Sequence, residues 1–169
     1  MYNSVKLSFI LVLETSPVSP LFIISGPELV IAQCKAGIVG SFPALNARPQ
    51  SQLDEWLHQI TEELAAHNRD NPDSPAAPYA VNQIVHRTNN RLEEDMVTCA
   101  KWKVPMLITS LGAREDLNKA AHEWGGITMH DVISDRFARK AIEKGAETIK
   151  FIIPNNKVSI SELINKITF

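Results

Sequence analysis

Short apolar runs alternate with segments of helical periodicity along most of the chain. The runs are rich in branched and aromatic side chains and only four to eight residues long, which is typical of buried strands. They lie at residues 21–24, 38–42, 79–85, 104–109, 126–133 and 148–153. An amphipathic helix is predicted after each run, so the pattern indicates a parallel sheet covered by helices.

Local signals mark where the first of these helices begins and ends. Ser25 and Glu28 have the spacing of a capping box, and Pro27 suits the first helical turn. Gly37 is placed to end the helix, because glycine adopts the left-handed conformation at little cost. A helix is therefore predicted between residues 25 and 37.

The later helices show one apolar face each. Ser51 and Asp54 open the second helix. Its apolar stripe consists of Leu53, Trp56, Leu57, Ile60 and Leu64. Residues 68–78 contain three prolines and predict a surface loop. In the helix that follows residue 85, the acidic run at residues 93–95 is predicted to be a solvated face.

Periodicity alone leaves two architectures open, a (β/α) barrel and an open, doubly wound sheet. The first strand–helix turn lacks the G-x-G-x-x-G motif, and the chain has no P-loop. A dinucleotide-binding or nucleoside-triphosphate-binding fold therefore loses support.

The first residues of the chain require a separate interpretation. Residues 5–13 are apolar apart from Lys6 and could suggest a signal peptide, but a basic segment and a good cleavage site are lacking. The run is also shorter than the ~20 residues of a membrane span. We interpret it as a strand or a non-native extension, with an export signal as the less favoured alternative.

Composition narrows the function classes. A net charge of −2 offers no electrostatic footprint for nucleic acid or for an anionic membrane surface. Cys34 and Cys99 form neither a C-x-x-C pair nor a zinc-binding spacing. They are interpreted as free thiols of a cytoplasmic protein, with a disulfide as the less favoured alternative.

Polar residues gather where the predicted strands end, and ligands bind at that end of parallel strands. They are Ser25, Ser41, Asn82, Gln83, His86, Arg87, Thr109, Ser110, His130 and Asp131. Asn82 lies inside an apolar strand, so its amide is either a satisfied core group or a partner for a planar heterocycle.

Other chemistries find less support at these positions. His130 and Asp131 are adjacent on a strand and face opposite sides, so a triad-like pair is not expected. A satisfied strand-end histidine is the favoured interpretation of His130. No clustered His and Cys residues predict a metal site. An aldolase would need a strand-end lysine, and only Lys150 comes close.

Five ordered sequence blocks resemble nitronate monooxygenases, formerly called 2-nitropropane dioxygenases. The blocks are SGPELVIAQ (25–33), KAGIVGSFPALNARP (35–49), YAVN (79–82), ITSLGAR (108–114) and HDVI (130–133). The resemblance covers residues 20–146, which correspond to the first half or so of a family member. It implies a partial TIM-type (β/α) barrel of the α/β class, with about six parallel strands alternating with helices.

The resemblance also implies a function and a site. The expected activity is FMN-dependent oxidation of alkyl nitronates by molecular oxygen, giving a carbonyl compound and nitrite. The cofactor carries this chemistry, and the protein positions it. The expected FMN-binding residues are Phe22, Ile23, Ser25, Asn82, Ser110 and His130. No catalytic residue is assigned, and His130 is only a weak candidate for a base.

The chain departs from the family at its C-terminal end. The family's catalytic histidine lies on a glycine-rich loop, whereas residues 147–169 contain neither glycine nor histidine. We divide the chain into a divergent extension (1–17), a nitronate monooxygenase-like domain (18–146) and a divergent strand and helix (147–169). The alternative to the enzymatic function is that the chain is a non-catalytic remnant, which lacks the site for the flavin phosphate. An oligomer is expected as one way to cover the open edge of the barrel.

Overall fold

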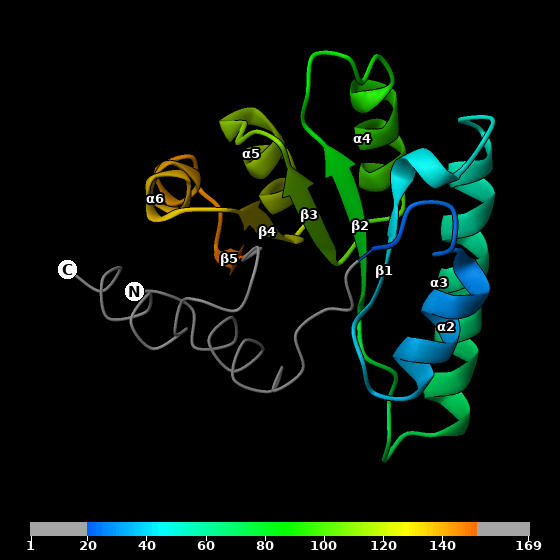
Figure 1. Cartoon of the computed structure of the whole chain (residues 1–169). Helices are drawn as coiled ribbons and strands as arrows, with labels where there is room; N and C mark the ends of the chain where they lie inside the picture. Colours follow the sequence, from blue (N-terminus) through cyan, green and yellow to red (C-terminus); the bar gives the residue numbers. More distant parts are fainter. Residues whose placement is uncertain (1–19, 152–169) are drawn as a thin grey trace.

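The computed structural model describes residues 20–151, which form one five-stranded parallel sheet with helices between the strands (Figure 1). The strands are β1 (Gly40–Pro43), β2 (Tyr79–Ile84), β3 (Met106–Ser110), β4 (Ile127–Val132) and β5 (Thr148–Phe151). The helices are α2 (Pro27–Lys35), α3 (Gln52–Asp70), α4 (Leu92–Lys101), α5 (Glu115–Glu123) and α6 (Asp135–Glu143), with a short 3-10 helix η1 (Ala44–Asn46).

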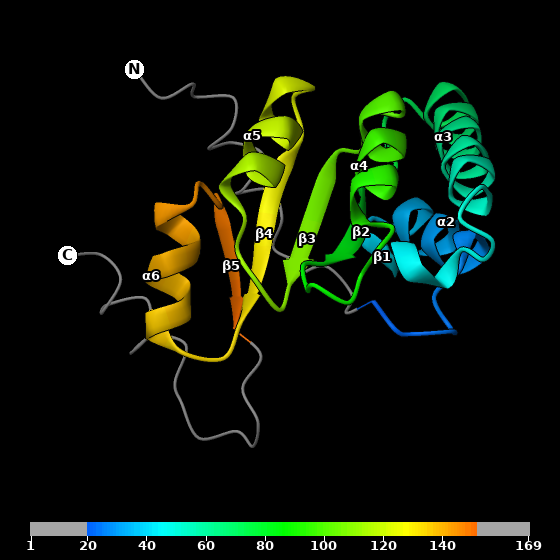
Figure 2. The same ribbon diagram turned by 90° about the horizontal axis from the view of Figure 1, so that it is seen from above.

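The strand order decides between the two architectures that the sequence left open. Each strand pairs in parallel with the next strand in the chain, in the order β1-β2-β3-β4-β5. A doubly wound sheet would reverse its order at a switch point. Helices α3 to α6 are ranged along one side of the sheet (Figure 2). The prediction of a partial (β/α) barrel is confirmed.

Side chains of the strands alternate between two faces. The outer face packs against the helices and includes Phe42, Val81 and Leu107. We call the opposite face the inner face. Its apolar cluster consists of Val39, Ala80, Met106, Ile108 and Met129. All five are buried, so the middle of the inner face is apolar.

The strand predicted at residues 21–24 is wrong, because this segment is a turn. Asn46 holds it: its Oδ1 accepts from Ile23 N (3.0 Å), and its Nδ2 donates to Leu21 O (3.0 Å) and to Ser25 O (2.9 Å). These bonds occupy backbone groups that a sheet would need. Ile23 also has a φ of 72°, which a strand does not allow. Five strands therefore replace the expected six among residues 20–151.

Two further predictions about side chains are wrong. The capping box does not form, since α2 has no side-chain cap bond and Ser25 Oγ accepts from Leu21 N at 2.9 Å. Asp95 is not solvated but fully buried, where Arg91 and Gln50 donate to its carboxylate. The acidic run thus contains two exposed glutamates and one buried ion-pair partner.

Several other predictions are confirmed or lie outside the described range. Gly37 ends α2 with a φ of 79°, and the stripe of α3 packs into the core. The helix predicted near the C-terminal end of the segment 147–169 and the extension at 1–17 lie outside the described residues. None of the described helices combines the length and apolar character that crossing a membrane requires.

Candidate functional site

A chain of polar side chains crosses three strands on the inner face, close to their C-terminal ends. Asn82 of β2 donates from Nδ2 to Ser110 Oγ of β3 at 2.8 Å. Ser110 Oγ in turn donates to Asp131 Oδ2 of β4 at 2.9 Å. The register brings them together, because Asn82 pairs with Ile108 and Ile108 with Met129. Ser110 and Asp131 each lie two residues further on and on the same face.

The orientation of the Asn82 amide is fixed by its neighbours. Nδ2 also donates to the Ile108 carbonyl oxygen at 3.1 Å. A flipped amide would place its oxygen against this carbonyl, so the nitrogen must occupy this position. Both hydrogens of Nδ2 are therefore used within the protein, and Oδ1 remains the group that Asn82 offers to a ligand.

Asp131 offers a second acceptor. Its Oδ1 is buried and has no hydrogen-bond partner among the described residues. A carboxylate oxygen without a partner in a buried position costs free energy, which a hydrogen-bond donor or a cation would recover. The inner-face cluster Asn82–Ser110–Asp131 thus presents acceptors, and it suits a ligand edge that carries N–H or O–H groups.

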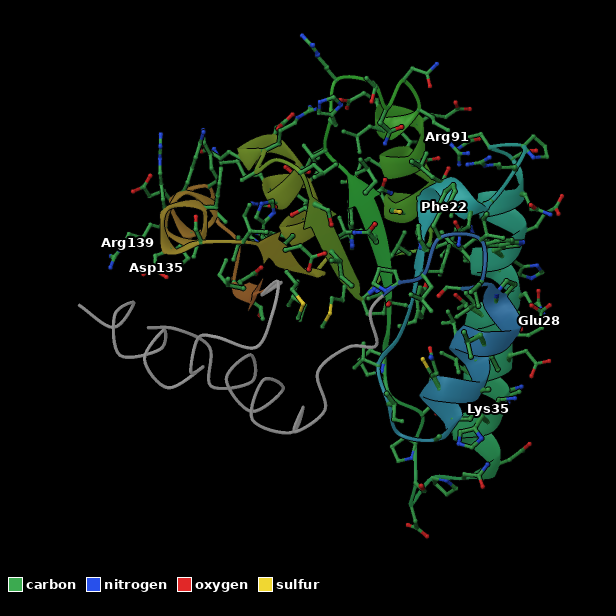
Figure 3. The ribbon with its side chains drawn as sticks, in the orientation of Figure 1. Phe22, Glu28, Lys35, Arg91, Asp135 and Arg139 are labelled. Atoms are coloured by element: carbon green, nitrogen blue, oxygen red, sulfur yellow. The ribbon has the colours of Figure 1, made fainter. Side chains whose placement is uncertain are left out.

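The turn at residues 21–24 stands at the end of β1, near the segment that follows this strand (Figure 3). Phe22 and Ile23 are exposed, by 55% and 81%, whereas Ser25 is buried. The guanidinium carbon of Arg48 lies 5.2 Å from the centroid of the Phe22 ring. Because Pro43, the last residue of β1, pairs with Asn82, the turn and the inner-face cluster belong to the same end of the sheet.

His130 does not belong to this cluster. Its Nδ1 bonds Thr109 Oγ1 at 2.5 Å, and Thr109 pairs with His130 across β3 and β4 on the outer face. Burial lowers the pKa of His130 below its ordinary value of 6.5, and the nearby Asp131 opposes this shift. Asp131, one residue further, faces the inner side, as expected for neighbours on a strand.

Five of the six predicted FMN-binding residues lie at this end of the sheet. Asn82 and Ser110 are directly bonded to each other. Phe22, Ile23 and Ser25 are held at the same end of the sheet through Asn46. The bond of Asp131 to Ser110 was not predicted from the sequence. The alternation of side chains along a strand could have indicated it. Ser110 lies on the same face of its strand as Met106, and Asp131 on the same face of its strand as Met129.

Among residues 20–151, no group of three or more His, Cys, Asp or Glu side chains could hold a metal ion. Cys34 and Cys99 are buried free thiols, as predicted. Burial raises the pKa of Cys99 to about 12 and also raises that of Cys34. Neither thiol is therefore poised as a nucleophile.

Comparisons with known proteins support the fold. No protein-family model matches the chain, and no curated protein matches it. Solved structures with a similar fold include FabK from Thermotoga maritima, with a TM-score of 0.68 and 17% identity over 88% of this chain and 43% of FabK. Nitroalkane oxidase from Streptomyces ansochromogenes has a TM-score of 0.59 and 16% identity, over 80% of this chain and 44% of that protein.

A third similar structure is ribulose-1,5-bisphosphate carboxylase/oxygenase from Pyrococcus horikoshii. Its TM-score is 0.55 at 10% identity, over 90% of this chain and 41% of that protein. The chain thus spans less than half the length of each of these proteins. At such low identities the similarity concerns the fold.

Proposed function

We propose that this chain forms the flavin-ring side of an FMN-dependent oxidoreductase. The proposed reaction is the oxidation of alkyl nitronates by molecular oxygen, which gives a carbonyl compound and nitrite. The observation that carries the proposal is the Asn82 amide, whose oxygen is held toward a ligand at the C-terminal ends of the strands. The fold similarity to a nitroalkane oxidase supports the same class of reaction.

The inner-face cluster fits one edge of a flavin ring. The pyrimidine edge of the ring carries one N–H between two carbonyl groups, and Asn82 Oδ1 can accept from this N–H. Asn82 cannot also donate to the ring carbonyls without giving up Ser110 or Ile108. The amide therefore contributes an acceptor only, which is half of the pairing expected from the sequence.

The other residues at this end would complete the ring site. Phe22 and Ile23 expose apolar surface that suits the benzenoid part of a flavin. Asp131 Oδ1, also in the inner-face cluster, favours ligand groups that donate a hydrogen bond and disfavours carbonyl oxygens, which can only accept one. When bound, FMN supplies the electron acceptor for the oxidation of the nitronate.

A non-catalytic protein with the same fold is the second candidate. Residues 147–169 contain neither histidine nor glycine, and the one histidine near the strand ends of β4 lies on the outer face. Loss of a general base typically lowers turnover by about 10²–10⁴-fold. We expect nitrite formation by the chain, with saturating FMN and an alkyl nitronate, to fall far below the ~10 s⁻¹ of an ordinary enzyme. Turnover near that value would exclude the second candidate.

Flavin binding is tested by titrating the chain with FMN and following flavin fluorescence. Asn82→Ala removes the acceptor and should weaken binding about 10-fold, the typical effect of one lost buried hydrogen bond. Asn118→Ala is the matched control. Asn118 is also a buried asparagine whose Nδ2 donates to a backbone carbonyl, Lys144 O at 2.8 Å, but it lies on α5.

The control variant should bind FMN as the unmodified chain does. Riboflavin, which lacks the phosphate, should bind about as tightly as FMN, since the proposed contacts are with the ring. Equal FMN affinity of the Asn82→Ala variant and the unmodified chain, with both folded by circular dichroism, would remove Asn82 from the site.

A further inference from the structure

A cavity of about 370 Å³ continues the candidate site beyond the C-terminal end of β4. It lies between the loop that follows β3, the end of β4 and the first turns of α6. Asp131 belongs to both, because it lines the cavity and its Oδ2 accepts from Ser110 of the inner-face cluster at 2.9 Å. The volume is within the range of small-molecule sites. We call it the β4 cavity.

The Asp131 carboxylate is held by one oxygen and leaves the other without a partner. Ser110, which orients Oδ2, is itself fixed by Asn82 Nδ2 at 2.8 Å. Oδ1 is buried and has no hydrogen-bond partner among the described residues. A buried acceptor in this state gains free energy from a ligand group that gives it a hydrogen. The β4 cavity thus has an oriented proton acceptor in its wall.

The rest of the lining suits a short alkyl body beside a group that becomes negative. Leu111, Ile133 and Phe137 leave 72%, 66% and 50% of their surface exposed. Lys140 of α6 lines the same cavity. None of the ion pairs among residues 20–151 involves Lys140, so its ammonium charge is not neutralised there.

The two charges of the lining favour a neutral ligand. A preformed anion is attracted by Lys140 but repelled by the Asp131 carboxylate. A neutral molecule that gives a proton to Asp131 avoids this repulsion, because the negative charge then leaves Asp131 and moves to the ligand. The total charge in the cavity stays the same, and Lys140 compensates the charge on the ligand. The lining therefore suits a neutral acid whose proton is removed after binding.

We propose that Asp131 is the base that removes the α-proton of a neutral nitroalkane bound in the β4 cavity. The C–H bond breaks, and its proton forms an O–H bond with Asp131 Oδ1. The electron pair of the C–H bond forms the carbon–nitrogen double bond, and the negative charge passes to the nitro oxygens beside the Lys140 ammonium group. The alkyl body packs against Leu111, Ile133 and Phe137.

The product of this step is a nitronate, which is the substrate of the proposed oxidation, so the inference rests on the proposed function. It assigns a base to a chain whose residues 147–169 contain no histidine. A carboxylate is ordinarily a weaker base than an imidazole, so proton removal by Asp131 should be slow compared with removal by a histidine.

Proton removal is measured without FMN, by following the exchange of the C1 protons of nitroethane for deuterium in D₂O by NMR. The full chain should accelerate this exchange above the buffer rate, with saturation at high nitroethane. Asp131→Asn keeps an oxygen that accepts from Ser110 and should lower the protein-dependent rate at least about 100-fold. Asp135→Asn is the matched control, because Asp135 begins α6 outside the cavity lining and should leave the rate unchanged.

A second pair of variants tests the cation. Lys140→Met keeps the length of the side chain, removes its charge and should slow the exchange about 10-fold, the typical effect of one charge-assisted bond. Lys144→Met should have no effect, because Lys144 follows the same helix but does not line the β4 cavity. Lys140 is exposed, so this pair keeps the proposal testable where Asp131→Asn does not fold.

His130 also lines the β4 cavity, and His130→Gln separates the two candidate bases. This variant should retain most of the exchange. Three results would overturn the proposal: no exchange above the buffer rate, equal rates in Asp131→Asn and His130→Gln, or equal rates in Lys140→Met and Lys144→Met. The exchange assay contains no flavin and the FMN titration contains no nitroalkane, so either inference can fail while the other holds.

Discussion

At the residue scale, a buried ion pair joins α4 to the segment that follows β1. Asp95 is fully buried and accepts from Arg91 Nη2 at 3.0 Å. Arg91 also donates to two backbone carbonyls near η1, Ala47 O at 2.8 Å and Ala44 O at 3.2 Å. The pair therefore fixes the segment that carries Asn46, which in turn holds the turn at residues 21–24.

Replacing Asp95 tests this role. Asp95→Ala leaves the Arg91 guanidinium without its carboxylate in a site where Arg91 is 17% exposed. The free energy of unfolding should fall by about 3 kcal/mol, the low end for a broken buried pair, because Arg91 keeps some contact with water. Glu94→Ala, an exposed neighbour, should change it by less than about 0.5 kcal/mol. Equal effects of the two substitutions in urea denaturation would contradict the account.

The sequence predicted some of these polar residues and missed others for a physical reason. Asn82 stands out because an amide inside an apolar strand needs partners wherever it lies. Asp95 does not stand out, because three adjacent acidic residues look alike until a basic partner is placed beside one of them. Arg91 provides that partner only after α4 has packed against the η1 segment.

At the scale of the elements, four helices end in the same way. Gly37, Gly125 and Gly145 follow α2, α5 and α6 with φ values of 79°, 87° and 90°. Lys103 takes the equivalent position after α4 with a φ of 47°. Its N–H donates to Ala100 O at 3.1 Å, as the glycine N–H groups donate to their own helices. A lysine pays a steric cost in this conformation that glycine avoids.

Lys103→Gly should therefore stabilise the chain. Glycine relieves the steric strain of the folded backbone, but it also makes the unfolded chain more flexible. The first effect is the larger, so the free energy of unfolding should rise by about 0.5–1 kcal/mol. Gly125→Lys is the reciprocal variant and should destabilise, although a Cβ at Gly125 meets no atom within 4 Å. Thermal unfolding of the two variants measures both effects. A lower melting temperature for Lys103→Gly would contradict this explanation.

Most helices and strands could be predicted from periodicity, and the exception is the strand expected at residues 21–24. Five of the six apolar runs form strands, because each has a neighbouring strand whose backbone groups pair with its own. Residues 21–24 are equally apolar, but Asn46 and Ser25 take up their backbone groups. Apolar composition indicates where a strand can form, whereas most of the competing side-chain bonds come from Asn46, far along the chain.

At the scale of the whole molecule, residues 20–151 form a segment of a barrel whose two faces carry different polar groups at the strand ends. The inner face carries the acceptors of Asn82 and Asp131, and the outer face carries the His130 ring, which bonds Thr109. The sequence predicted both groups at the strand ends but assigned them to one site. The alternation of side chains along β4 separates them.

The central claim is that a flavin ring binds at the inner-face cluster. It is tested most directly by adding FMN to the ¹⁵N-labelled chain and mapping the shifts of assigned amide resonances. The account predicts shifts of the Asn82 side-chain amide and of the Ser110 and Asp131 backbone amides, with Lys140 on α6 unaffected. No saturable shifts, or shifts confined to α6 and the loop after β3, would contradict it.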